Sequence, residues 1–432
     1  NPDFVRRFTQ AERDAVISAR TFNAGSLKYP VSISLIKELF PDTFVPAGVN
    51  VAPVSTETAN VVGGHVTLQA GGASSQIGRV TGVVKIDIPA NGFAGLTEQQ
   101  QELLSRVTVN DILTKTYAFQ ADGVTPDTTR LLSVTLRLVD DIDIQADTDM
   151  QTSNPVTITA DAGAGVALQT DAGLNINHIR SGAGGDVRLQ VGGDIQDLYS
   201  DPTAAITTFG DLNIRSASVY GVDPATPPQN GTDPLRIQLA RSSALSADVA
   251  GTATIRQVAA DATLNGQFQN IDDLYVSRVD ASGDIFIEVM QGDMQVGKVS
   301  GTNVDLRAAR SVLDATDDAV DASANVTASG NTYVKTATGD IGTAGNFLDV
   351  DIAGQFSADA GQDVFVHSLN NHDLTIGTIT AGRLVRLNAD LGIFDQASGN
   401  TFDVDIQAIS AILQAVTGIG TAANPLETQL SH

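Results

Sequence analysis

The chain contains no cysteine and no tryptophan in its 432 residues. Without cysteine it can form no disulfide, no thiolate metal site and no cysteine nucleophile. It also has no uninterrupted apolar run of the length that a helix needs to cross a bilayer. A start methionine and a signal peptide are missing at Asn1, so we expect the sequence to be a piece of a longer protein.

Basic residues are scarce. Lys and Arg total 25 against 50 Asp and Glu, which gives a formal net charge of −25. A field of that sign disfavours nucleic acid or an anionic membrane surface as a partner. Asp outnumbers Glu and falls largely in Gly-Asp and Ala-Asp contexts, which are turn positions, so we expect most of this charge to be solvated.

The dominant residues are Ala, Gly, Asp, Thr, Val and Ile, a mixture typical of many short strands joined by tight turns. One pattern occurs three times, in segments 174–197, 294–315 and 374–396. Two apolar residues, a leucine and an aspartate recur at matching places in each segment. These positions are Ile176, Ile179, Leu189 and Asp197; Val296, Val299, Leu306 and Asp314; and Ile376, Ile379, Leu387 and Asp395.

A second pattern occurs twice, as TGDIGTAGNFLDVDIAG from residue 338 and TGIGTAANPLETQLSH from residue 417. We expect Gly342 and Gly420 to carry the backbone around a corner that a Cβ resists. In the first copy Leu348, Val350 and Ile352 alternate with aspartates. That alternation predicts a strand with its apolar side chains on the core face.

Short strands at a fixed period predict a stack of coils in which no unit buries its apolar side alone. A β-sandwich array has similar strand spacing, but it needs longer strands and Asn-Gly hairpin turns, which are rare here. A parallel β-helix fits better, and the crossover rule predicts right-handed winding. The predicted fold class is therefore all-β, a right-handed parallel β-helix with short helical insertions near the N-terminus.

Four regions are predicted along the chain. Residues 1–54 form a mixed helical lead-in or cap, and residues 55–96 form the first β-helical coils. Residues 97–139 hold a helical insertion, which starts with a capping box at Thr97, and a return to strands. Residues 140–432 form the repetitive β-helix. We expect the helical pieces to cover an edge whose backbone groups would otherwise be unpaired.

The stretches GGDVRLQVGGDI, GDIFIEVMQGDMQVGKVSGTNVDLRAARSVLDA, GDIGTAGNFLDVDI and GIGTAANPLETQL resemble the repeats of giant bacterial exoproteins of the filamentous haemagglutinin-like adhesin type. The resemblance covers about residues 140–432 well, residues 60–90 loosely and residues 1–54 hardly at all. It implies a right-handed β-helical shaft in a very long, surface-anchored chain that is secreted across the outer membrane. It implies no catalytic or cofactor-binding residue.

Paired carboxylates are candidates for catalytic or metal-binding groups. A glycosidase needs two carboxyls at a defined separation, and adjacent aspartates on one strand point to opposite faces. No tandem calcium-binding nonapeptide or EF-hand loop is present, so only weak, adventitious Ca²⁺ binding is expected, and no other cofactor. The weak calcium candidates are Asp140, Asp141 and Asp143, and the other aspartate pairs are Asp272–Asp273 and Asp317–Asp318.

Histidines offer little more. His367 and His372 are the one close pair, their spacing in a strand-and-turn context does not match a helical zinc site, and no third ligand is evident. We therefore expect no metal centre there, and no enzymatic activity in the chain.

The expected function is that of a non-enzymatic shaft segment of a secreted adhesin or extracellular filament at the bacterial cell surface. Its partners would be neighbouring coils of the same chain or other copies, and an unidentified host, matrix or cell-surface ligand. One alternative is a self-assembling β-helical filament subunit that adds strands at its coil ends. A carbohydrate-active β-helix enzyme is another, although aromatic residues make up only 5% of the chain.

Overall fold

The regular elements of the described residues are all β-strands. The chain divides into two compact units. The helices expected within residues 1–54 and after Thr97 lie outside the described residues. The computed structural model describes residues 61–89, 96, 112–119, 126–140, 142–145, 156–182, 184–198, 204–221, 233–240, 243–259, 273–316, 323–369, 372–396 and 404–431.

The first unit contains a set of short parallel strands. In it β1 pairs with β6, β6 with β8, β8 with β10, and β2 with β7. These strands are β1 (Val61–Val62), β2 (His65–Ala70), β6 (Ile142–Gln145), β7 (Val156–Ala162), β8 (Val166–Thr170) and β10 (Val187–Val191). Three strands are divided between the two units: β9 (Leu174–Arg180), β11 (Ile195–Asp197) and β13 (Leu212–Ser216).

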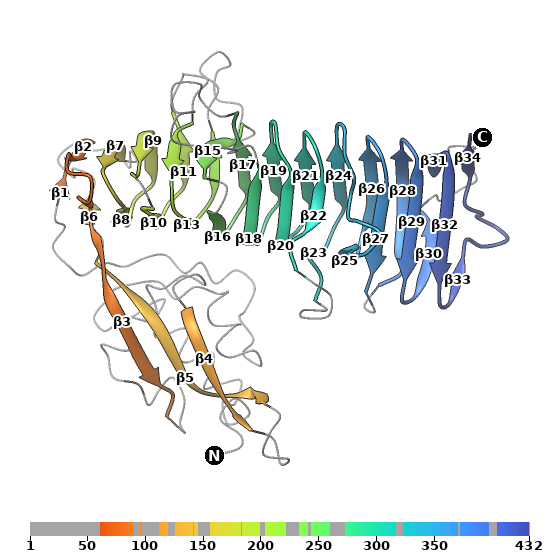
Figure 1. Cartoon of the computed structure of the whole chain (residues 1–432), viewed down its shortest axis with the longest axis horizontal. Coiled ribbons are helices and arrows are strands. Elements are labelled where there is room, and N and C mark those ends of the chain that lie inside the picture. The colour runs from red at the N-terminus through yellow and green to blue at the C-terminus, as the bar shows by residue number, and fades with distance from the viewer. Residues whose placement is uncertain are drawn as a thin grey trace. The chain divides into compact units, whose positions relative to one another are not determined.

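The first unit also holds a three-stranded antiparallel sheet in the order β3-β5-β4 (Figure 1). Its strands are β3 (Arg79–Asp87), β4 (Ile112–Phe119) and β5 (Pro126–Asp140). Ile86 and Val134 are register partners across this sheet, and both are 0% exposed. β3 lies within residues 55–96, which were expected to form the first β-helical coils. It pairs instead with β5, and the two strands run antiparallel.

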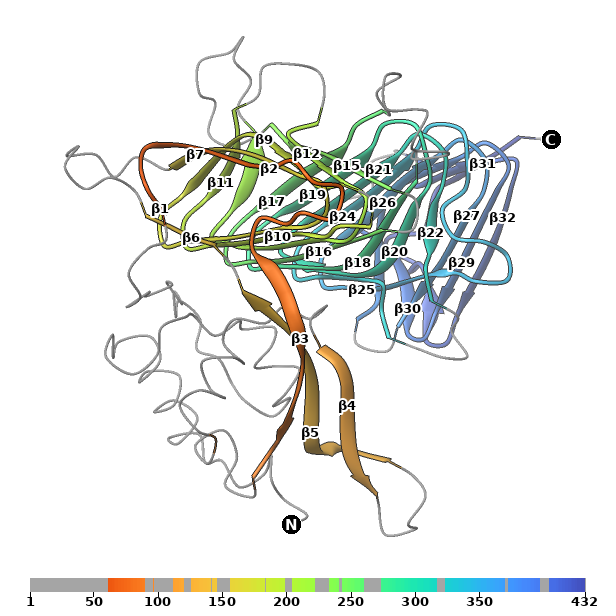
Figure 2. The ribbon, with the colours of Figure 1, turned by 60° about the vertical axis from the view of Figure 1, so that its left-hand side comes forward.

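The second unit is a stack of parallel strands. Figures 1 and 2 show its strands in rows, each strand beside the equivalent strand of the next coil. One row runs β16-β18-β20-β23-β25-β27-β29-β32, and another runs β12-β15-β17-β19-β21-β24-β26-β28-β31-β34. Leu274 pairs with Met294, so one coil there takes 20 residues. The second unit is therefore β-helix-like, as the short repeated strands predict.

The strands of the second unit are mostly three to eight residues long. Their bounds are β12 (Ile206–Thr208), β14 (Val219–Gly221), β15 (Leu235–Leu239), β16 (Ala244–Val249), β17 (Ala253–Gln257), β18 (Leu274–Ala281), β19 (Ile285–Val289), β20 (Met294–Gly301), β21 (Val304–Ala308), β22 (Val312–Asp314), β23 (Val326–Ala328), β24 (Thr332–Thr336), β25 (Leu348–Ile352), β26 (Gln355–Ala360), β27 (Val364–Ser368), β28 (Leu374–Ala381), β29 (Leu384–Ala389), β30 (Gly392–Asp395), β31 (Ile406–Ala408), β32 (Ser410–Ala415), β33 (Gly418–Ile419) and β34 (Thr428–Leu430).

The cores are built from the recurring apolar positions. Burying each Val, Leu or Ile there contributes about 1.5–3 kcal/mol. Ile352 is 3% exposed, and the other positions singled out by the repeats are 0% exposed. They are Ile176, Ile179, Leu189, Val296, Val299, Leu306, Leu348, Val350, Ile376, Ile379 and Leu387.

Two glycines turn corners in the left-handed region of backbone space. Gly342 has φ 67° and Gly420 has φ 59°. A Cβ on Gly342 would also lie 2.2 Å from the carbonyl oxygen of Phe365 in the next coil. A side chain at Gly342 therefore meets both a strained backbone and a steric clash.

Side-chain oxygens in the turns form hydrogen bonds between successive coils. In each bond a side-chain oxygen of one turn accepts the backbone N–H at the same place one coil further on, over 2.8–3.2 Å. The final N–H is that of Leu384. We call the acceptor residues the turn ladder: Asp273, Asp293, Ser311, Asp340 and Asp363.

Arginines lie beside this ladder. Arg310 pairs with Asp273 and Asp293, and Arg383 pairs with Asp363 at 2.7 Å. The turn aspartates therefore do more than solvate the surface, because each binds a backbone group of its neighbour.

None of the described residues forms a helix long and apolar enough to cross a bilayer.

Candidate functional site

The two copies of the IGTA pattern each gather three polar residues from separate segments. At the first copy these are Asp349 of the copy itself, within β25, and two residues of earlier segments, Asp314 at the end of β22 and Asn325 before β23. The Asn325 amide nitrogen donates to Asp314 Oδ1 at 2.6 Å, and Asn325 Oδ1 accepts the Asp349 N–H at 2.8 Å. Asn325 and Asp349 are 1% and 2% exposed, so the amide satisfies groups that water scarcely reaches.

The second copy repeats this arrangement with a different middle residue. Its three positions are Asp395 in β30, Asp405 before β31 and Glu427 before β34, which we call the carboxylate trio. Asp405 Oδ2 accepts the Glu427 N–H at 2.8 Å, as the amide oxygen does in the first copy. Asp405 therefore stands where Asn325 stands, and a carboxylate replaces an amide donor.

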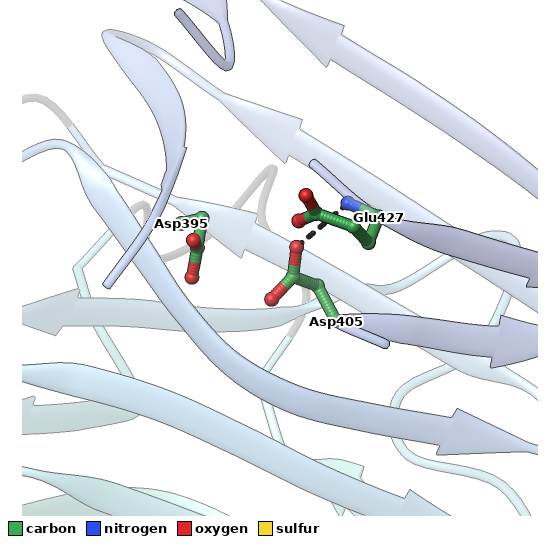
Figure 3. A group of neighbouring side chains, drawn as sticks. All are labelled: Asp395, Asp405 and Glu427. Atoms are coloured by element: carbon green, nitrogen blue, oxygen red, sulfur yellow. Dashed lines mark hydrogen bonds between the residues drawn. The ribbon is translucent and has the colours of Figure 1, made fainter. Parts of the chain in front are cut away.

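The carboxylate trio concentrates negative charge (Figure 3). One oxygen from each residue lies within 4.8 Å of the others. Asp405 is 6% exposed. Burial raises the pKa of Asp405 to about 6, helped by the side chain of Glu427 and by the charge of Asp395, and opposed by the Glu427 N–H. Ionisation of Asp405 therefore costs free energy, because its carboxylate is buried beside two others. The neutral amide at the same place in the first copy carries no such cost.

Oxygens this close can share a proton or a divalent cation. Ca²⁺ takes about six to eight oxygen ligands, and three carboxylates supply only part of that shell. The trio was not among the calcium candidates from the sequence. Asp395 belongs to the pattern that occurs three times in the sequence. Asp405 and Glu427 are recognised as its neighbours only when the two copies are aligned over their whole length.

One coil earlier, a histidine lies between carboxylates. His367 Nδ1 lies 3.1 Å from Asp349 Oδ1, and Nε2 lies 3.1 Å from Asp390 Oδ1. The hydrogen bond with Asp349 raises the pKa of His367 to about 9, burial opposes it, and Asp390 adds to the rise. His367 is therefore a cation at neutral pH. Its ring links its own coil to the coil before it, through Asp349, and to the coil after it, through Asp390.

The second histidine of the close pair also contacts an aspartate. His372 Nδ1 lies 2.8 Å from Asp351 Oδ1. Each ring of the pair thus contacts an aspartate that precedes it in the chain. This arrangement directs the rings to separate carboxylates rather than to one shared ion.

The structure describes only part of the aspartate set singled out in the sequence. Asp140 ends β5 and Asp143 lies in β6. Asp273 belongs to the turn ladder, where its Oδ1 accepts the Asp293 N–H at 3.0 Å. Four further candidates lie outside the described residues: Asp141, Asp272, Asp317 and Asp318.

Comparisons of this chain with models of protein families, with curated proteins and with solved structures find no match.

Proposed function

We propose that this chain is a non-enzymatic structural segment of a large secreted bacterial surface adhesin or extracellular filament. In this proposal the coils wind in a right-handed sense, and helical pieces within residues 1–54 and 97–139 protect an edge. The segment stands at the cell surface and supports attachment, contact between cells or with matrix, or biofilm formation. The resemblance of its repeats to filamentous haemagglutinin-like exoproteins supports this assignment.

The observation that carries the proposal is the stacking of the second unit. Its strands bury their apolar side chains against the coils before and after them, and the turn ladder joins the same coils. Stability in such an array grows as a sum of coil–coil contacts. A protein built this way gains length and stiffness with each coil, which suits a shaft.

The test is immunogold electron microscopy of source cells with an antibody to this segment, beside the mass of the parent polypeptide on a denaturing gel. Label along thin surface fibres, with a mass far above the 44.9 kDa of this chain, is the expected result. Diffuse soluble label near that mass contradicts the proposal and directs attention to a screen for polysaccharide cleavage.

A self-assembling filament subunit is the second candidate. It is favoured by the parallel pairing of the second unit, in which each strand adds to the equivalent strand of the neighbouring coil. Fibre label together with a parent mass near 44.9 kDa would select this candidate.

A further inference from the structure

Five neighbouring strands in the middle of the second unit carry charged side chains on their outer face. The strands are β17, β19, β21, β24 and β26 (Figure 1). In β19, β21 and β24 buried positions alternate strictly with partly exposed ones. One outward position of each strand is in register with that of the next, and we call these five residues the charged row: Arg256, Glu288, Arg307, Lys335 and Asp359.

Each member of the charged row has an ionic partner within the chain. Glu288 pairs with Arg256 at 2.5 Å, and Arg307 pairs with Asp305 of its own strand at 2.7 Å. Lys335 pairs with the last member of the row at 2.7 Å. These six side chains are between 22% and 44% exposed, so a partner can reach them. Their charges sum to zero on a chain of net charge −25, and this face therefore lets two copies approach with little repulsion.

Two aromatic rings lie beside the charged row. Phe286 of β19 and Tyr333 of β24 are both register partners of Asp305 in β21. The Arg307 guanidinium carbon lies 5.2 Å from the centroid of the Phe286 ring and 5.6 Å from that of the Tyr333 ring, within cation–π range. These contacts give the face a defined shape. We call the charged row, the two rings and Asp305 the lateral face.

The order of charges in the row is complementary to itself when it is reversed. A twofold axis along β21 places β17 of one copy opposite β26 of the other, and β19 opposite β24. Arg256 then faces Asp359, and Glu288 faces Lys335, so opposite charges meet at both places. An interface between identical copies repeats each of these contacts once by symmetry.

The residues nearest the axis fit the same arrangement. Phe286 of one copy faces Tyr333 of the other, which forms an aromatic pair. Each copy also brings Arg307 and Asp305 of β21 to the axis. The four charges there sum to zero, and each guanidinium has a carboxylate of either copy within reach.

We propose that the lateral face binds a second copy of this chain, with the two stacks side by side and antiparallel. Five strands about 4.8 Å apart offer on the order of a few hundred Å² per copy, less than the ~800 Å² of a standard interface. The contact is therefore weak and reversible. It involves the sides of the stack, so it depends neither on the ends of the chain nor on the proposed function.

The chain has no cysteine, so a single introduced thiol gives a unique cross-linking site. Packed sheets lie about 10 Å apart, and a bismaleimide linker of that span is the probe. Ala309→Cys, two positions after Arg307 and beside the axis, should cross-link to its own equivalent. Ser357→Cys in β26 would lie about 20 Å from its equivalent, too far for the linker. Gln295→Cys, exposed on β20 in the other row of strands, reports random collisions.

Charge reversals in the Ala309→Cys chain test the pairing, in about 0.15 M salt to screen more distant charges. Glu288→Lys and Lys335→Glu each place like charges opposite one another at two places, so each alone should lower the cross-linked fraction about tenfold. A mixture of these two variants restores opposite charges and should restore cross-linking. Lys298→Glu, the same charge change at an exposed position of β20, is the matched control and should have no effect. Circular dichroism melts show whether each variant is folded.

Cross-linking of Ala309→Cys at the level of Gln295→Cys overturns the inference. Equal cross-linking of Ser357→Cys overturns the antiparallel arrangement, since side-by-side parallel stacks bring every coil to its own equivalent. A mixture of the charge variants that fails to cross-link overturns the pairing of Glu288 with Lys335. None of these results bears on the location or mass of the parent protein, which the electron-microscopy test of the proposed function measures separately.

Discussion

Leu387→Asp places a carboxylate in the middle of the stacked core. Leu387 is 0% exposed in β29 and pairs in register with Val366 of β27 and Leu413 of β32. Truncation of such a side chain to alanine costs about 2–5 kcal/mol. A carboxylate adds the penalty of an unpaired buried charge, so the total is on the order of several kcal/mol, a large part of the stability of most domains.

The assay is hydrogen exchange with urea melts as the global measure. Nearest-neighbour energetics predict lost protection in β27, β29 and β32, while β19, several coils away, keeps its protection. Gln414→Asp, an exposed position on β32, is the matched control and should change stability by less than about 0.5 kcal/mol. A wild-type melt and unchanged protection in Leu387→Asp would refute the assignment of this residue to the core.

Three further predictions concern single residues. Asp405→Asn should stabilise the chain at pH 7 by about 1–2 kcal/mol. The pKa of Asp405 is raised to about 6 in the folded chain, so the free energy of unfolding of the wild type falls as the pH rises from about 4 to 6. Urea melts at about pH 4 and pH 6 should show a smaller change in the free energy of unfolding for the variant. His367 has its pKa raised to about 9, so its contribution is full below about 6.5 and is lost as the pH rises through 9. His367→Gln should therefore lower the melting temperature at pH 6 and have little effect at pH 10; an equal effect at both would contradict the ion pair. Gly342→Ala should destabilise by about 1–3 kcal/mol in urea melts, because φ is 67° and the Phe365 carbonyl lies 2.2 Å from the new Cβ; a neutral result would exclude the strained corner.

The described elements are all strands, as predicted, and the predicted stacking of parallel strands is confirmed outside the antiparallel sheet of β3, β4 and β5. The prediction succeeded because the alternation in segments such as Leu348–Ile352 and the recurring small residues act locally, within one strand and one turn. The antiparallel sheet of β3, β4 and β5 was not foreseen. Alternating patterns such as that of β5 are the same whether the neighbouring strand runs parallel or antiparallel, so the sequence carries no local signal of direction.

The carboxylate trio was missed for a related reason. Asp395 lies in a recognised repeat, but Asp405 and Glu427 reach it from other segments, and their meeting depends on the register of β28, β31 and β34. The contact of His367 with Asp349 likewise depends on register, since 18 positions separate the two residues. Spacing along a chain with loops of varying length does not reveal such pairs.

In the turn ladder each coil offers an oxygen to the coil after it and an N–H to the coil before it. Asp340 illustrates both roles, since its N–H meets Ser311 and its carboxylate meets the N–H of Asp363. Duplication of a whole coil adds one donor and one acceptor together and leaves neither buried and unpaired. Insertion of one residue between the turns shifts the oxygen away from its donor. A gene for such a protein can therefore lengthen or shorten by whole coils, with no new core to evolve at the join.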